Sequence, residues 1–145
     1  MKNKFVNAHM KVAETYAQLS SARRLQVGCV IVKNDTIIGI GYNGMPSGWD
    51  NKCEDDVYVD DMHVQLVTKP EVIHAEANAL AKVTRSTNSS EGSFLFVTHA
   101  PCMDCAKQIY QAGIAEVIFK HLNLKNNDGI DFLTKCNIPI RQYEP

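Results

Sequence analysis

The chain has 145 residues, 45% of them hydrophobic, and a formal net charge of −1 at pH 7, which fits a single domain over residues 1–145 with its own core. Its basic residues are scattered rather than gathered in one stretch, so we expect no nucleic acid partner and favour a small substrate. No apolar run approaches the roughly 18 residues that cross a bilayer, and the first residues lack a signal-peptide core, so we expect a cytoplasmic protein with no membrane partner.

The first half of the chain predicts a helix and then a β-hairpin. Apolar residues recur near helical spacing over residues 5–20, which predicts an amphipathic helix that buries Phe5, Val12, Tyr16 and Leu19. Two runs rich in β-branched residues, 27–33 and 36–42, flank Asn34-Asp35, the composition of a tight hairpin turn. Residues 43 to about 70 are rich in Gly, Pro and Asp and predict a loop.

The second half of the chain alternates between helices and strands. A run of strong helix formers predicts a helix from about 74 to 86. The elements expected after it are a turn at 87–92, a strand at 93–98, a helix at 102–112 capped by Gly113, a strand at 116–119, a short helix at 129–136 and a strand at 138–143. This order predicts an α/β fold, a three-layer α-β-α sandwich around a mixed five-stranded sheet that starts with a β-hairpin. Ligands of such sheets bind at the carboxyl ends of parallel strands.

One pair of motifs predicts a metal site. His74-Ala75-Glu76 is followed about 25 residues later by Pro101-Cys102-Met103-Asp104-Cys105. Catalytic zinc sites typically use three protein ligands and leave the fourth position to water, and His74, Cys102 and Cys105 supply three. If a helix begins after Pro101, both thiols lie on one side of its first turn, where the helix dipole favours the thiolates that bind zinc.

Glu76 is the candidate for proton transfer. It lies two positions from His74, about 200° around a helix, so it need not share the ligand's direction. Zn²⁺ lowers the pKa of its bound water towards about 7, and a nearby carboxylate can take that proton and deliver it to a leaving amine. We therefore expect a hydrolytic site with one Zn²⁺ per chain and Glu76 as its proton shuttle.

Each motif alone has other readings. His-x-Glu at a helix start is most often a surface pair, and Cys-x-x-Cys can be a redox pair, half a zinc finger or two buried thiols. The conjunction favours the hydrolytic site, although a fourth ligand such as Cys53 would give a non-catalytic, zinc-stabilised binding domain instead. The remaining cysteines, Cys29 and Cys136, lie in different contexts, so we expect no disulfide framework.

The zinc motif is typical of nucleobase deaminases. Together with Val27–Val32 and the run Gly39–Gly48, it makes nearly the whole chain resemble the dCMP deaminase family of the cytidine deaminase superfamily. The resemblance implies a cytidine deaminase-like fold and zinc-dependent hydrolysis of dCMP to dUMP and ammonia, which feeds thymidylate synthesis. The alternatives are a deaminase of another cytosine nucleotide or of adenosine in tRNA, since these share the zinc chemistry.

The resemblance also implies substrate contacts. Asn43 would contact the sugar or base, the Ala75 N–H the pyrimidine O2, and the Ala100 carbonyl the exocyclic amine. For the phosphate, Arg24 of the Arg23-Arg24 pair is the most suggestive cation, although adjacent Arg residues are more often solvated. Many relatives carry a Tyr after the strand at 116–119, and its absence here leaves room for His121 or Lys125.

Members of this family are commonly hexameric, activated by dCTP with Mg²⁺ and inhibited by dTTP. The resemblance places the effector site near a loop that contains Gly44, Pro46, Gly48 and Trp49. Trp49 is either a buried anchor, which we favour, or an effector or interface contact. The acidic residues at 53–56 and 60–61 either help to hold Mg²⁺ or form a solvated loop.

Overall fold

The computed structural model describes residues 1–145 and contains four helices and seven strands. In chain order they are α1 (Asn3–Ala17), β1 (Gly28–Lys33), β2 (Thr36–Tyr42), β3 (Glu54–Asp60), β4 (His63–Thr68), α2 (Ala75–Thr84), β5 (Phe94–His99), α3 (Met103–Gln111), β6 (Glu116–His121), α4 (Asp128–Lys135) and β7 (Ile140–Gln142). None of the helices combines the length and apolar character that a bilayer crossing requires.

Five strands form one mixed sheet in the order β2-β1-β5-β6-β7. Strand β1 pairs antiparallel with β2 and β5, whereas β6 pairs parallel with β5 and β7. Asn34 and Asp35 have φ of +50° and +60°, the left-handed conformation that a two-residue turn needs to match the twist of its strands. The predicted hairpin and the mixed five-stranded sheet are confirmed.

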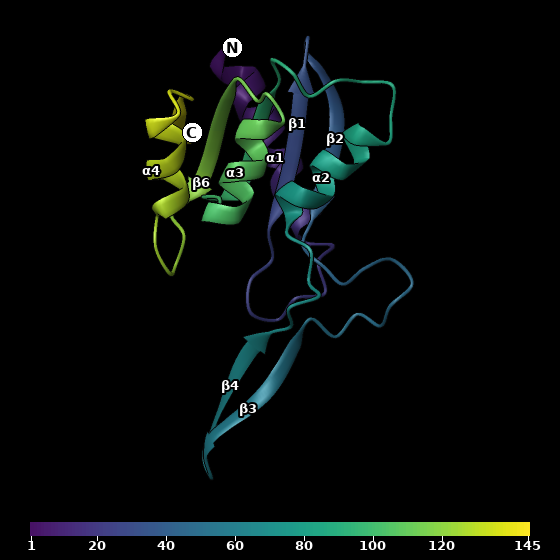
Figure 1. Cartoon of the computed structure of the whole chain (residues 1–145), viewed down its shortest axis with the longest axis vertical. Helices are drawn as coiled ribbons and strands as arrows, with labels where there is room; N and C mark the ends of the chain where they lie inside the picture. The colour runs from purple at the N-terminus through teal and green to yellow at the C-terminus, as the bar shows by residue number, and fades with distance from the viewer.

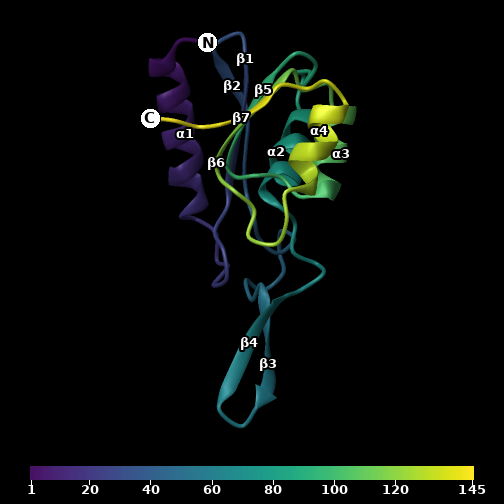
Figure 2. The same ribbon diagram turned by 90° about the vertical axis from the view of Figure 1, so that its left-hand side faces the viewer.

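Helices cover both faces of this sheet. Figure 2 shows α1 alone on one face and α2, α3 and α4 together on the other. Alternate side chains of a strand point to opposite faces, and β1 is apolar on both. Val30 and Val32 pack with the α1 residues Val6 and Met10, whereas Ile31 belongs to the larger core on the opposite side. The predicted α-β-α layering is confirmed.

The buried face of α1 is not the one predicted. Its buried residues are Val6, Met10, Ala13 and Ala17, whereas Phe5 and Leu19 are exposed. Our prediction followed the large apolar residues, but the stripe that faces the sheet contains two alanines. These small side chains let the helix lie close to β1, where a Cβ at Gly28 would come within 1.9 Å of the Ala13 carbonyl oxygen.

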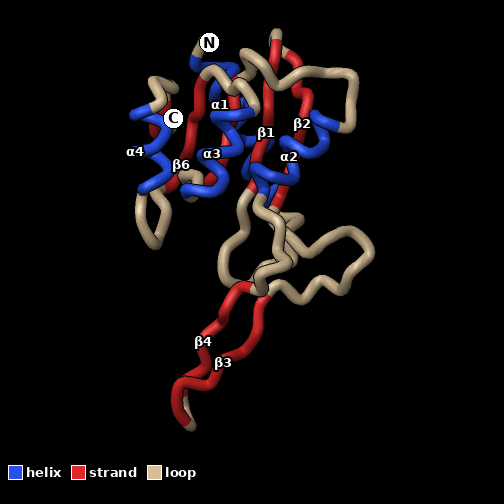
Figure 3. Tube along the Cα trace, viewed as in Figure 1, coloured by secondary structure: helices blue, strands red, loops and turns tan.

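The prediction of a loop over residues 43 to about 70 is wrong for its second half. Strands β3 and β4 pair antiparallel and form a separate two-stranded ribbon, which we call the arm (residues 54–68). Figures 1 and 3 show the arm projecting from the body of the molecule, with long loops at its base. The arm was missed because Asp has low strand propensity and because its turn, Asp61-Met62, lacks Gly and Asn.

Candidate active site

The structure brings His74, Cys102 and Cys105 together. Their ligand atoms all lie within 4.8 Å of one another, although the residues come from two different helices. The His74 Nδ1 atom lies 3.3 Å from the Cys105 Sγ and 3.6 Å from the Cys102 Sγ. His74 is the N-cap residue of α2 and Cys102 that of α3, so the partial positive charge of two helix starts faces one point.

Two glycines allow the backbone to approach this point closely. A Cβ at Gly41 of β2 would lie 2.3 Å from the Ala75 carbonyl oxygen, so only glycine lets the first turn of α2 lie against the sheet there. A Cβ at Gly129 of α4 would lie 2.1 Å from the Pro101 carbonyl oxygen, just before the first cysteine. Both helix starts that carry the cluster therefore depend on positions without a side chain.

The sulfur and nitrogen donors fit zinc. The Cys102 thiol accepts hydrogen bonds from Cys105 and His74, which lower its pKa to about 4, so it is a thiolate at neutral pH. The same contact with Cys102, together with burial, raises the pKa of Cys105, and the hydrogen bond to Cys102 raises that of His74. Two cysteine sulfurs and one imidazole at these distances are a typical Zn²⁺ donor set.

The carboxyl group of Glu76 lies beside the cluster and is only 4% exposed. Burial raises its pKa, while its own backbone N–H and the nearby His74 act in the opposite direction. A buried carboxyl with a raised pKa holds a proton more readily than an exposed one and can release it again, which is what general acid–base catalysis requires. Glu76 sits on the first turn of α2, two residues from the N-cap His74.

The cluster opens into a cavity of about 390 Å³, a size typical of small-molecule sites. The predicted substrate contacts Asn43, Ala75, Ala100 and Arg24 all line it, as do His74, Glu76 and Cys102. The cavity lies beyond the carboxyl end of β5, because Ala100 and Cys102 follow that strand directly. Lys125, one of two residues that we considered in place of the missing Tyr, lines the cavity as well.

Asn43 has a structural role that the sequence did not reveal. Its side-chain oxygen accepts a hydrogen bond from the Val27 N–H at 2.9 Å, and its side-chain nitrogen donates to the Leu25 carbonyl at 2.8 Å. The amide therefore holds one wall of the cavity. Each end of an amide can form a second hydrogen bond, so a substrate contact remains open to it.

Sequence reasoning missed two further residues of the cavity wall. Asn123 donates from its side-chain nitrogen to the Ala100 carbonyl at 3.3 Å. His99 ends β5, and its ring lies 5.0 Å from that of His121. Burial and then His121 lower the pKa of His99, which favours its neutral form. A histidine that ends a parallel strand just before the Pro-Cys motif was the available signal for His99.

The other predicted sites lie elsewhere. Trp49 is 57% exposed, so the prediction of a buried anchor is wrong. Gly44, Pro46 and Gly48 do not line the cavity, and neither does Trp49. Cys53 lines the cavity but stands apart from the His-Cys-Cys cluster, with its Sγ 3.7 Å from the Asn51 carbonyl oxygen.

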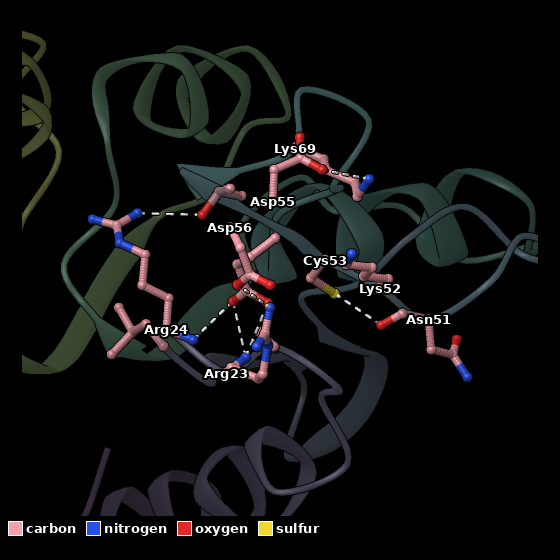
Figure 4. Close-up of polar contacts among 12 residues, drawn as sticks. Arg23, Arg24, Asn51, Lys52, Cys53, Asp55, Asp56 and Lys69 are labelled. Atoms are coloured by element: carbon pink, nitrogen blue, oxygen red, sulfur yellow. Dashed lines mark hydrogen bonds and ion pairs between the residues drawn. The ribbon is translucent and has the colours of Figure 1, made fainter. Parts of the chain in front are cut away.

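The acidic run at the base of the arm does not converge on one point. The Asp55 carboxylate pairs with Lys69, and that of Asp56 pairs with Arg23 (Figure 4). Acidic side chains that are each engaged by a different cation do not form a cluster for a divalent ion. The structure gives no support to the predicted Mg²⁺ contact.

Comparison with known proteins agrees with this geometry. Residues 3–121 match the family model described as the cytidine and deoxycytidylate deaminase zinc-binding region. The chain belongs to the cytidine and deoxycytidylate deaminase family. The matched residues include the His-Cys-Cys cluster, Glu76 and the whole sheet except β7.

The relatives of this family member include named deoxycytidylate deaminases. The human protein is 44% identical over 114 residues, a match that covers 76% of this chain and 61% of the human protein, less than two thirds of its length. The mouse protein is 43% identical over 144 residues, which cover 94% of this chain and 78% of the mouse protein. The dCMP deaminase of cyanophage S-TIM5, solved in complex with dCMP and dUMP, is 40% identical, with a TM-score of 0.87 and 99% of both chains covered. The expected cytidine deaminase-like fold is confirmed.

Proposed function

We propose that this family member hydrolyses dCMP to dUMP and ammonia and so supplies a precursor for thymidylate synthesis. The observation that carries the proposal is the His74, Cys102 and Cys105 cluster beside the buried carboxyl of Glu76, at the wall of a cavity large enough for a nucleotide. The cyanophage relative, similar over 99% of both chains, was solved with dCMP and dUMP. The cluster geometry and the similarity to this relative both favour hydrolytic deamination.

The chain's own residues supply positioning and proton transfer. Zn²⁺, when held by the cluster, would polarise a water molecule so that it acts as a nucleophile near neutral pH. Glu76 takes one proton of the attacking water and delivers it to the ring nitrogen as the C4–O bond forms. It then carries the second proton, from the new C4 hydroxyl, to the amine, so that the C4–N bond breaks, the carbonyl forms and ammonia leaves. The Ala75 N–H and the Ala100 carbonyl orient the cytosine edge, because an analogue that leaves these groups unpaired suffers a desolvation penalty.

The substrate phosphate would meet Arg24 and Lys125. They are the only two Lys or Arg residues among those that line the cavity, and they reach it from different segments, one before β1 and one after β6. A phosphate carries its charge on oxygens that accept hydrogen bonds from such side chains. Cations in the cavity wall would favour a nucleotide over a nucleoside.

A substrate panel tests the proposal. The zinc-loaded protein is incubated separately with dCMP, dCTP, cytidine and a tRNA anticodon stem, and ammonia release is measured at a fixed zinc content. We expect turnover of dCMP at least tenfold above that of cytidine. Ammonia released only from the RNA would overturn the proposal.

We further propose that the protein is a homo-oligomer, with a hexamer favoured, and that dCTP and dTTP regulate it. The arm supports assembly, because it exposes Tyr58, Val59 and Met62 and an isolated two-stranded ribbon is marginally stable in water. Five of the 16 acidic residues but none of the 15 Lys and Arg residues lie in the arm, so the arm of one copy complements the more basic body of another. Backbone hydrogen bonds between Gly44 and Ile73 support regulation, since they tie the proposed effector loop to the residue before His74.

A further inference from the structure

Glu54, at the base of the arm, is a buried carboxylate to which the mechanism above gives no role. It is 1% exposed. One of its oxygens accepts hydrogen bonds from the backbone N–H groups of Arg23, at 2.9 Å, and of Arg24, at 2.8 Å. The other oxygen accepts from the Arg23 N–H at 3.2 Å. Dashed lines at the labelled Arg23 and Arg24 mark these bonds in Figure 4. Burying a charge is costly unless hydrogen bonds compensate it, and here the two N–H groups provide them. The carboxylate and the backbone of Arg23 and Arg24 are therefore held together.

The Arg23-Arg24 corner has no regular secondary structure to hold it. It lies in the connection between α1 and β1, residues 18–27. The later part of this connection is fixed by Asn43, which binds the backbone of Leu25 and Val27. The N–H groups of the corner itself bind only Glu54. Without that carboxylate, two consecutive backbone donors would lose their partner and the corner would be free to move.

The corner separates the two arginine side chains. The Arg23 guanidinium reaches outward to the Asp56 carboxylate at 3.2 Å, and its side chain is 51% exposed. The Arg24 guanidinium instead donates to the Thr68 hydroxyl at 3.2 Å, and both residues line the cavity. The backbone direction at this corner therefore decides which arginine faces the cavity.

We infer that Glu54 is a positioning residue for the substrate phosphate: its carboxylate fixes the Arg23-Arg24 corner so that the Arg24 guanidinium lies at the cavity. This inference rests on the proposed function, since it requires a nucleotide substrate. Glu54 acts through Arg24 and does not touch the reacting atoms. Because Glu54 is also the first residue of β3, the same carboxylate connects the base of the arm to the corner that carries Arg24.

The test compares dCMP with deoxycytidine, the same substrate without its phosphate. Glu54→Gln keeps the size of the side chain but removes the charge that holds two N–H groups. We expect its KM for dCMP to rise about tenfold with kcat within twofold, because a charge-assisted contact is lost at a distance from the chemistry. Its kcat/KM for deoxycytidine should stay within twofold of the wild type. Asp56→Asn, which removes an exposed neighbouring carboxylate, is the matched control and should leave both substrates unaffected.

A double-mutant cycle links the effect to Arg24. Arg24→Gln should raise the KM for dCMP at least as much as Glu54→Gln, and the double variant should be no worse than Arg24→Gln alone, since both changes remove the same contact. Zinc content and thermal unfolding are recorded for each variant. Glu54→Asp, which keeps the charge on a shorter side chain, should give an intermediate KM and covers the case in which Glu54→Gln does not fold.

Several results would overturn the inference. One is an unchanged KM for dCMP in the folded Glu54 variants. Another is an equal loss of turnover on dCMP and deoxycytidine that follows the loss of zinc or of the fold, because that result indicates a purely structural role. If these results occur while the wild-type protein deaminates dCMP, the proposed function stands and only the inference fails. If the wild-type protein does not deaminate dCMP, both fail together.

Discussion

At the scale of single residues, the proposed mechanism assigns metal binding and proton transfer to different residues. The donors of His74, Cys102 and Cys105 face one another, whereas Glu76 is buried beside them and does not belong to the ligand cluster. A carboxylate that bound the metal could not also shuttle protons freely. The two functions can therefore be removed one at a time by substitution.

Glu76→Gln should retain zinc and the fold but lower kcat by at least a thousandfold, because the amide fills the same space without accepting a proton. Cys102→Ala should instead lower zinc content to well below one ion per chain, since two donors remain. Both variants are checked by metal analysis and by ammonia release from dCMP. Equal zinc loss in the two variants would contradict the assignment of Glu76 to proton transfer.

We expect His99 to make the stability of the folded protein depend on pH. Burial and His121 lower its pKa in the folded protein, so the unfolded chain takes up a proton first as the pH falls through the ordinary value of about 6.5. The contribution of His99 to the free energy of unfolding is therefore unaffected above that pH and becomes unfavourable below it. We expect the wild type to lose stability between pH 7 and pH 5 more steeply than His99→Gln, as measured by urea unfolding of the zinc-loaded proteins. Identical slopes would exclude this role for His99.

At the scale of elements, the cluster residues lie at the starts of α2 and α3, and two glycines let these helix starts pack closely against their neighbours. The first turn of α2 lies against β2 only because Gly41 has no side chain, and the α3 start is bounded in the same way by Gly129. The atoms nearest to both glycines belong to the backbone, so the glycines determine where the backbone of the cluster residues lies. Ala at such a position meets backbone atoms, which cannot rotate away as a side chain can.

Gly41→Ala should therefore be strongly destabilising. The added Cβ would lie 2.3 Å from the Ala75 carbonyl oxygen and 2.5 Å from the Ala79 nitrogen, so α2 must shift. We expect a loss of about 2–3 kcal/mol in the free energy of unfolding, together with weaker zinc retention. Gly44→Ala, where a Cβ would meet nothing within 4 Å, is the control and should change stability by less than about 0.5 kcal/mol. Similar losses in both variants would argue against close packing as the cause.

At the scale of the whole molecule, the arm is the feature that a single chain does not explain. It projects from the body in both views (Figures 1 and 2). Its large apolar side chains Tyr58, Val59 and Met62 are exposed. A strand pair exposed in this way invites pairing or burial by another chain. The proposed assembly would cover it with a second copy.

Light scattering after size exclusion tests this assembly. We expect the wild-type mass to be a multiple of the single-chain mass, with six chains favoured. Tyr58→Lys combined with Val59→Lys should shift the mass towards the single chain, because two charges replace apolar surface that is 73% and 63% exposed. Thr15→Lys, on the exposed surface of α1, is the control and should leave the mass unchanged. A wild-type protein that runs as one chain would contradict the assembly.

The amino-acid sequence alone determined the elements whose signals are local. Asn34-Asp35 specified the hairpin turn. The strong helix formers after His74 and the proline before Cys102 predicted the starts of α2 and α3. The α-β-α order followed because each apolar face needs a partner layer. Likewise, the two motifs supplied the three residues of the His-Cys-Cys cluster.

Only the tertiary structure decided the features that depend on close approach between distant segments. The buried stripe of α1 was set by alanines that fit against β1, and the arm formed by pairing of residues with weak strand propensity. The holding of the Arg23-Arg24 corner by Glu54 joins residues 30 or more positions apart and has no local signal. Such contacts depend on the space between packed elements and on backbone donors that lack a partner in regular secondary structure. Both arise only in the folded chain, so a local sequence pattern does not predict them.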